Sequence, residues 1–140
     1  MARDEKLDLL RGISIFSGLD KRRLERLGML ADEVDVGSGK PLMQQGEIGS
    51  DMMVIVSGRV AVERDGQRLN TLGPGDFFGE IALFDGGPRT ATVTTEEPTR
   101  LLVVTHRDFH ALMDEFPEVA AQVLAALAQR IRRLEPDSPH

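Results

Sequence analysis

Short β-rich runs separated by glycine-containing turns fill the middle of the chain, from Ala31 to Thr105. Asp65-Gly66 is the dipeptide of a type I′ hairpin, while Ser57-Gly58 and Gly73-Pro74-Gly75-Asp76 are further chain-turning segments. Closely spaced strands with such turns predict a sandwich or barrel rather than a βαβ sheet. The predicted strands are Glu33–Val36, Pro41–Gln44, Met52–Val56, Arg59–Glu63, Arg68–Leu72, Thr90–Thr94 and Arg100–Val104.

A helical pattern precedes the strand region. Leu7, Leu10 and Ile13 recur at helix-like spacing, which indicates one apolar helix face. Asp20 is a suitable N-cap for a second helix that starts at Lys21. The first 30 residues are therefore predicted to be helical.

The segment after the strands is helical again. Thr105 and Asp108 have the spacing of a capping box, and Pro117 suits the first turn of a last helix that runs to about Leu134. The apolar residues of that helix form a coiled-coil seam of two heptads. This seam leaves two alternatives open, a homodimer through the helix or packing of the helix back on the barrel. The seam consists of Ala120, Leu124, Leu127, Ile131 and Leu134.

The length of 140 residues suits one globular domain with a substantial core. Hydrophobic residues make up 41% of the chain, so global disorder is not expected. We expect a single domain over residues 1–134, with N-terminal helices over 1–30, the strand region over 31–105 and C-terminal helices over 106–134. Residues 135–140, which include two prolines, are expected to form a flexible tail.

Composition excludes several classes of protein. No apolar run approaches the ~20 residues that a membrane helix needs, and the charged start of the chain has no apolar segment behind it. We therefore expect no membrane span, no signal peptide and a cytoplasmic protein. The absence of cysteine excludes disulfides, thiolate metal sites and cysteine nucleophiles. A net charge of −6 argues against a general nucleic-acid surface.

One stretch combines a glycine, a carboxylate and an arginine in a way that fits an anionic sugar phosphate. Gly79 lets a ligand approach the backbone, and a short helix over Glu80–Phe84 would direct free N–H groups at an anion. Arg89 presents a fork of donors to phosphate oxygens, whereas Glu80 suits a sugar hydroxyl. The spacing leaves one alternative open, an internal salt bridge between Glu80 and Arg89.

Two segments of this stretch closely resemble the phosphate-binding cassette of cyclic nucleotide-binding domains. Such domains occur in protein kinase A regulatory subunits, cyclic nucleotide-gated channels and the bacterial cAMP receptor protein. The resemblance covers most of the chain and implies a mainly β fold, an eight-stranded antiparallel β-roll of jelly-roll type with N-terminal helices and two C-terminal helices. The matching segments are Phe78-Gly79-Glu80-Ile81-Ala82-Leu83 and Pro88-Arg89-Thr90-Ala91-Thr92-Val93.

The resemblance also implies a role for each residue of the ligand site. Arg89 would pair with the exocyclic oxygens of a cyclic phosphate, and Glu80 would accept a hydrogen bond from the ribose 2′-hydroxyl. Gly79 and Ala82 would offer backbone contacts, and Ala91 would lend its backbone N–H to the phosphate. The complete set of expected ligand-binding residues is Phe78, Gly79, Glu80, Ile81, Ala82, Arg89, Thr90 and Ala91.

Thr90 occupies the position that bears on the choice of base. In the family a hydroxyl at this position is associated with guanine contact, but several cAMP-selective members also have it. One neutral hydrogen bond contributes ~1 kcal/mol, or about fivefold in affinity, so Thr90 does not decide between the two ligands. We expect cAMP as the ligand, with cGMP as the alternative, and neither a cofactor nor a metal.

No set of residues indicates catalysis or DNA binding. His106 and His110 lack a third ligand for zinc, and no nucleophile–base pair has a recognisable spacing. In the cAMP receptor protein a helix-turn-helix follows the long last helix, whereas this chain ends at His140. We therefore expect neither enzymatic activity nor DNA binding.

These observations support one main hypothesis about function and one alternative. The main hypothesis is a regulatory sensor that binds a cyclic mononucleotide and couples its occupancy to movement of the C-terminal helices. The resemblance implies this coupling, because in the family the last helix moves on binding and covers the base. The output would be an unidentified protein partner or self-association. The alternative is an interaction module that keeps the fold but no longer binds nucleotide.

Overall fold

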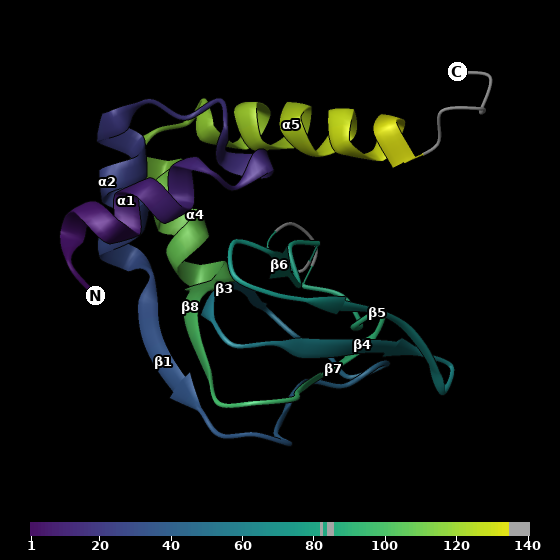
Figure 1. The fold of residues 1–140 in the computed structure, drawn as a ribbon. Helices are drawn as coiled ribbons and strands as arrows, with labels where there is room; N and C mark the ends of the chain where they lie inside the picture. The colour runs from purple at the N-terminus through teal and green to yellow at the C-terminus, as the bar shows by residue number, and fades with distance from the viewer. Residues whose placement is uncertain (82, 84–85, 135–140) are drawn as a thin grey trace. The chain divides into compact units, whose positions relative to one another are not determined.

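Two four-stranded antiparallel sheets form the middle of the chain in the computed structural model, which describes residues 1–81, 83 and 86–134 (Figure 1). The strands are β1 (Asp32–Val36), β2 (Pro41–Met43), β3 (Asp51–Ser57), β4 (Val60–Arg64), β5 (Gln67–Leu72), β6 (Phe77–Phe78), β7 (Thr92–Thr95) and β8 (Thr99–Thr105). One sheet has the order β1-β8-β3-β6 and the other β2-β7-β4-β5. This arrangement confirms the predicted eight-stranded antiparallel roll.

Side chains from both sheets meet in one core inside the roll. Ile55, Phe78 and Leu101 come from the first sheet, and Val60 and Val93 come from the second. Each of the five is at most 6% exposed. Because neighbouring side chains of a strand point to opposite faces, burial of this set fixes which face of each strand is turned inward.

The other predicted strands differ from the observed ones by one residue at one or both ends, and two differences are larger. Strand β6 was not predicted, since two residues are too few to show an alternating pattern. Strand β7 begins at Thr92 rather than at Thr90. The chain ahead of β7 is bound elsewhere, since the Arg89 N–H donates to the Glu47 carbonyl at 2.7 Å and the Thr90 carbonyl accepts from Arg64. The predicted hairpin turn is confirmed, because Asp65 and its following glycine both have positive φ.

The helices flank the strands in the chain, as predicted. They are α1 (Arg3–Arg11), the 3-10 helix η1 (Ser14–Phe16), α2 (Lys21–Leu30), α4 (His106–Glu115) and α5 (Val119–Leu134). The chain divides into two compact units: a helical unit, made of Met1–Met29 with His110–His140, and a roll unit, Leu30–Phe109. The division of the chain into one domain and a tail stays a prediction.

Local capping explains where two of the helices begin. The Arg23 N–H donates to Asp20 Oδ1 at 3.0 Å, and the Asp108 N–H donates to Thr105 Oγ1 at 3.0 Å. Both predicted caps are therefore confirmed. The last helix begins at Val119, two residues later than expected from Pro117, because the Val119 N–H still belongs to a tight turn onto the Phe116 carbonyl.

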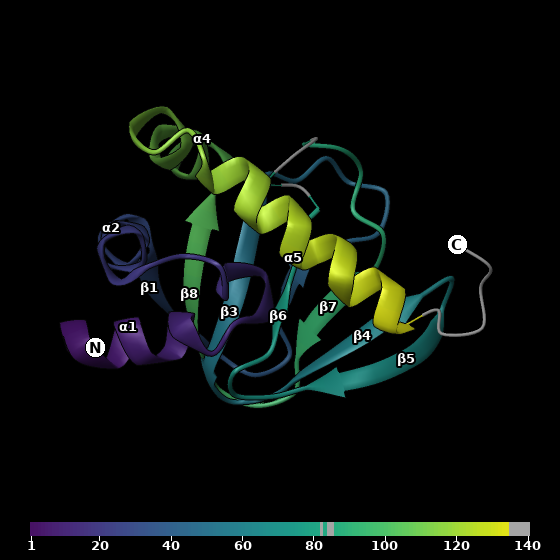
Figure 2. The same cartoon turned by 90° about the horizontal axis from the view of Figure 1, so that it is seen from above.

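Within the helical unit, α1 and α2 lie against each other (Figures 1 and 2). Arg3 and Glu25 form an ion pair at 2.8 Å, and the buried Gly28 lies beside the Leu10 side chain. Helix α5 packs near η1 through the buried Val119 and Val123.

The predicted seam of α5 is partly exposed, since Ala120 and Leu127 are half-buried whereas Leu124 and Ile131 face solvent. Leu124 is 48% exposed and Ile131 is 49% exposed, so about half of each side chain is left uncovered by the described chain. A homodimer through this seam stays a prediction. In the part of the chain that the structure describes, no helix has the length and apolar character needed to cross a membrane.

Candidate ligand-binding site

The first cassette segment leaves the core and turns immediately. Phe78 ends β6 and is buried, whereas Glu80 is half-buried and Ile81 is 49% exposed in the turn that follows. Leu83 is helical and fully buried. Ala82, one of the expected ligand-binding residues, lies outside the described residues, as do position 84, which ends the predicted short helix, and position 85 after it.

Gly79 has a backbone conformation and surroundings that only glycine suits. Its φ is +80°, in the left-handed region. A Cβ at this position would lie 2.7 Å from the Asp51 carbonyl oxygen and 2.9 Å from Arg89 Nη1. The glycine therefore brings the first cassette segment directly against the arginine of the second.

Arg89 is held by backbone rather than by a carboxylate. Its Nη1 donates to the Asp51 carbonyl at 2.8 Å, and its guanidinium lies so close to Gly49 that a Cβ there would be 1.9 Å from Nε. The ion pairs found among the described residues do not include Arg89, so the predicted alternative of a salt bridge with Glu80 is not observed. The half-buried guanidinium keeps donors available for another acceptor.

The main chain around Arg89 is fixed to the loop before β3. The Arg89 N–H donates to the Glu47 carbonyl at 2.7 Å, and the Gly46 N–H donates to the Arg89 carbonyl at 2.8 Å. Ile48 and Pro88 form an isolated β-bridge alongside. These bonds set the direction in which the arginine leaves the backbone, before any ligand is considered.

Two adjoining cavities lie beside the guanidinium. The smaller, of ≈ 50 Å³, is lined by residues that include Gly79, Glu80, Ile81, Arg89 and Thr90. The larger, of ≈ 250 Å³, shares Arg89 with it and extends along the loop before β3. Together they reach the lower end of the range for small-molecule sites, about 300 Å³.

The structure thus brings together five of the eight expected residues around one small cavity. Phe78 and Ala91 are 6% and 4% exposed and lie next to this set in the chain. Sequence reasoning missed Gly49 and Asp51, which hold the arginine. The one available signal was a glycine two residues ahead of an acidic residue that directly precedes a predicted strand, and such a pattern has no specificity by itself.

The charged side chains at the smaller cavity are few. Among residues 1–81, 83 and 86–134, no group of three or more metal-ligating side chains of His, Cys, Asp or Glu is found. Glu80 is the acidic side chain that lines the smaller cavity, together with Arg89. One cation and one anion at a small cavity suit a ligand that has both an anionic group and hydroxyls.

The sequence matches one family model and is similar to several known proteins. The family model described as "Cyclic nucleotide-binding domain" matches residues 33–116. The CRP-like cAMP-activated global transcriptional regulator of Mycobacterium tuberculosis is 33% identical over 131 residues, which cover 90% of this chain and 58% of that protein. The chain therefore spans a little over half the length of this relative.

Solved structures show the same fold. The N-terminal domain of a transcriptional regulator from Streptomyces coelicolor superposes with a TM-score of 0.81 at 35% identity, covering 94% of this chain and 97% of that one. The regulatory domain of Toxoplasma gondii PKA, solved with cAMP, gives a TM-score of 0.72 at 28% identity over 79% of this chain and 44% of that one. On its fold, its cassette and a family match that spans more than half of its residues, the chain belongs to the cyclic nucleotide-binding domain family.

Proposed function

We propose that this chain is a sensor module that binds a cyclic mononucleotide, cAMP in preference to cGMP, at the site around Arg89. The proposal rests on the burial and the bonding partners of the Arg89 guanidinium. Its guanidinium is half-buried, bonded to a backbone carbonyl, without a carboxylate partner in the described chain, and beside a cavity that also exposes Glu80. A desolvated, unneutralised guanidinium is a strong binding group for a phosphate.

The proposed contacts divide the ligand between the two cassette segments. The donors of Arg89 that Asp51 does not use would bind the exocyclic phosphate oxygens, and the Ala91 N–H would add a second donor. Glu80 would accept from the ribose 2′-hydroxyl, where its charge is separated from the phosphate. Gly79 and Ala82 would contribute backbone contacts.

The remaining expected residues would contact the ligand or hold the turn of the cassette in place. Phe78 would anchor the turn from the core, and Ile81 would supply apolar contact, since half of its surface is exposed beside the cavity. Thr90 is exposed and lines the same cavity, which suits a contact to the base. The preference for cAMP draws support from two relatives, one described as cAMP-activated and one solved with cAMP.

Binding would be transmitted through the C-terminal helices. Helix α5 exposes Leu124 and Ile131, apolar groups that are available to a protein partner or to a second copy when the helix moves. The relative from M. tuberculosis is described as a transcriptional regulator, which suits a regulatory rather than a catalytic role for the module. The output of binding is part of the proposal.

Thermal unfolding with cAMP, cGMP and 5′-AMP tests the proposal directly. A ligand at a hundredfold excess over its dissociation constant should stabilise the chain by ~2.7 kcal/mol, or several degrees in Tm, with cAMP giving the largest shift. Absence of a shift with all three nucleotides would contradict the proposal and favour a module that has lost its ligand. A shift with cAMP followed by its conversion to 5′-AMP would indicate a phosphodiesterase instead.

A further inference from the structure

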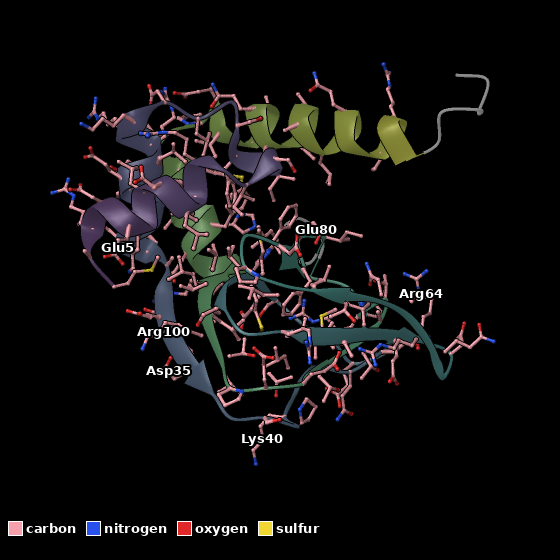
Figure 3. All side chains as sticks on the ribbon, viewed as in Figure 1. Glu5, Asp35, Lys40, Arg64, Glu80 and Arg100 are labelled. Atoms are coloured by element: carbon pink, nitrogen blue, oxygen red, sulfur yellow. The ribbon has the colours of Figure 1, made fainter. Side chains whose placement is uncertain are left out.

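We propose that Arg64 is a positioning residue for the phosphate of the ligand, and that it acts through the peptide group between Thr90 and Ala91. This inference rests on the proposed function and adds a residue that the cassette motif does not contain. Arg64 ends β4 and its side chain is exposed (Figure 3). Its Nε donates to the Thr90 carbonyl at 2.9 Å, across 26 positions of the chain.

The geometry of a trans peptide gives this contact a direction. No cis peptide is found in the described chain, and in a trans peptide the C=O and the next N–H point to opposite sides. The bond from Arg64 fixes the Thr90 carbonyl on one side. The N–H of Ala91 is thereby aimed at the other side, away from Arg64.

The backbone N–H of Ala91 is a hydrogen-bond donor that belongs to a buried residue. Ala91 is 4% exposed, and no hydrogen bond to its N–H is found among the residues that the structure describes. A buried N–H without a partner is rare, because it forfeits its hydrogen bond to water. Ala91 lies two positions after Arg89, which lines the cavity. An anion bound at Arg89 is therefore a suitable acceptor for the Ala91 N–H.

The charge of Arg64 makes the Ala91 N–H a stronger hydrogen-bond donor. A cationic donor on the carbonyl polarises the whole peptide group and makes its N–H a better donor. Arg64 forms no ion pair with the described residues, and the neighbouring Asp65 carboxylate instead accepts from Gln45 Nε2 at 2.9 Å. By contrast Arg68, on the next strand of the same sheet, is paired with Glu96.

Both flanks of the peptide are also held. On one side the Arg89 carbonyl accepts from the Gly46 N–H at 2.8 Å, and on the other Thr92 Oγ1 accepts from the Gln45 N–H at 3.0 Å. Between these two points the Thr90 carbonyl has Arg64 as its partner. Loss of Arg64 would therefore free one peptide group to rotate without releasing the segment that contains it.

Calorimetric titration of cAMP into three variants tests the role of Arg64. Arg64→Met removes the charge and the donor but keeps the apolar stem, and we expect about 5- to 20-fold weaker binding from the loss of a charge-assisted bond. Arg68→Met is the matched control, an exposed arginine of the same sheet, and should change affinity by less than about twofold. Arg64→Lys keeps a charged donor and should recover part of the loss.

A second readout follows the peptide itself in the ligand-free chain. The ¹H and ¹⁵N shifts of the Ala91 amide should change in Arg64→Met and stay unchanged in Arg68→Met. The inference is overturned if Arg64→Met binds cAMP as tightly as Arg68→Met, or if the Ala91 amide does not respond. A wild-type chain that binds no nucleotide would refute the proposed function, while the Ala91 amide would still report whether Arg64 orients the peptide.

Discussion

Arg89 in the roll unit and Arg23 in the helical unit are both partly buried arginines, but their surroundings differ. Arg23 forms ion pairs with Asp20 and Glu118, and its guanidinium lies 5.1 Å from the centre of the Phe116 ring. Arg89 has one bond to a backbone carbonyl and two glycines against its guanidinium.

The difference separates an arginine that joins elements from one that is held for a ligand. Arg23 has its charge neutralised by two carboxylates and connects α2 to the turn between α4 and α5. A carbonyl dipole fixes the direction of Arg89 without cancelling its charge, so the attraction for an incoming anion is retained. The nature of the partner, rather than burial, distinguishes the two roles.

The largest expected effect comes from truncating the ligand arginine. Arg89→Ala should lower cAMP affinity by ~2–5 kcal/mol, because the phosphate loses its charged partner inside the site. The unfolding free energy should change little, since the side chain makes one hydrogen bond to the fold. Calorimetry that finds the variant within about threefold of the wild type, a difference below ~1 kcal/mol, would contradict the assignment.

A smaller effect is expected from filling the space beside Arg89. Gly79→Ala should destabilise the chain by ~2–4 kcal/mol, because the Cβ adds a clash with Asp51 and Arg89 to the cost of a positive φ. Gly75→Ala is the matched control, with a φ of +86° and open space around it, and should cost ~1–2 kcal/mol. Urea unfolding measures both, and equal losses would mean that the close approach to Arg89 is unimportant.

Removing the structural arginine should show the opposite profile. Arg23→Met should lower the unfolding free energy by ~1–2 kcal/mol, or a few degrees in Tm, through the loss of two ion pairs and a ring contact. Arg22→Met, which loses a ring contact at 5.4 Å, should cost less than ~1 kcal/mol. Titration of cAMP should give nearly wild-type affinity for both, and a large affinity loss in Arg23→Met would undo the comparison.

The smallest effect concerns an arginine paired entirely at the surface. Arg100 Nε donates to Asp35 Oδ1 at 2.8 Å, and this bond, with the charge of the guanidinium, holds the pKa of Asp35 below its usual range (Figure 3). A carboxyl with a lowered folded pKa stabilises the chain above its unfolded pKa, and that contribution is lost as the pH falls through the folded value. In Arg100→Met the pKa of Asp35 should rise, and a carboxyl ¹³C titration that shows no rise would contradict the pairing.

Features that depend on neighbours in the sequence could be predicted from it. The caps at Asp20 and Thr105 and the turn at Asp65 involve residues within three positions of one another, so composition and spacing are sufficient. The cassette motif likewise located Gly79 and Arg89, because each is required at a fixed place in a short segment.

Contacts between distant positions could not be predicted in this way. Arg89 bonds to a carbonyl 38 positions earlier, and Arg64 bonds to one 26 positions later. A carbonyl is present in every residue, so the sequence does not identify Asp51 as the partner. Strand β6 was missed for a related reason, since its two residues pair with β3 through tertiary structure rather than through any pattern of their own.

The two bonds that Arg89 makes through its main chain have a consequence for hydrogen exchange. Its N–H and carbonyl are tied to Glu47 and Gly46, so this part of the loop before β3 and the cassette should open as one cooperative segment. The amides of Gly46 and Arg89 should then exchange with solvent deuterium at related rates. Nucleotide bound at the guanidinium should slow both, so the loop would report occupancy of the site through its rate of isotope uptake.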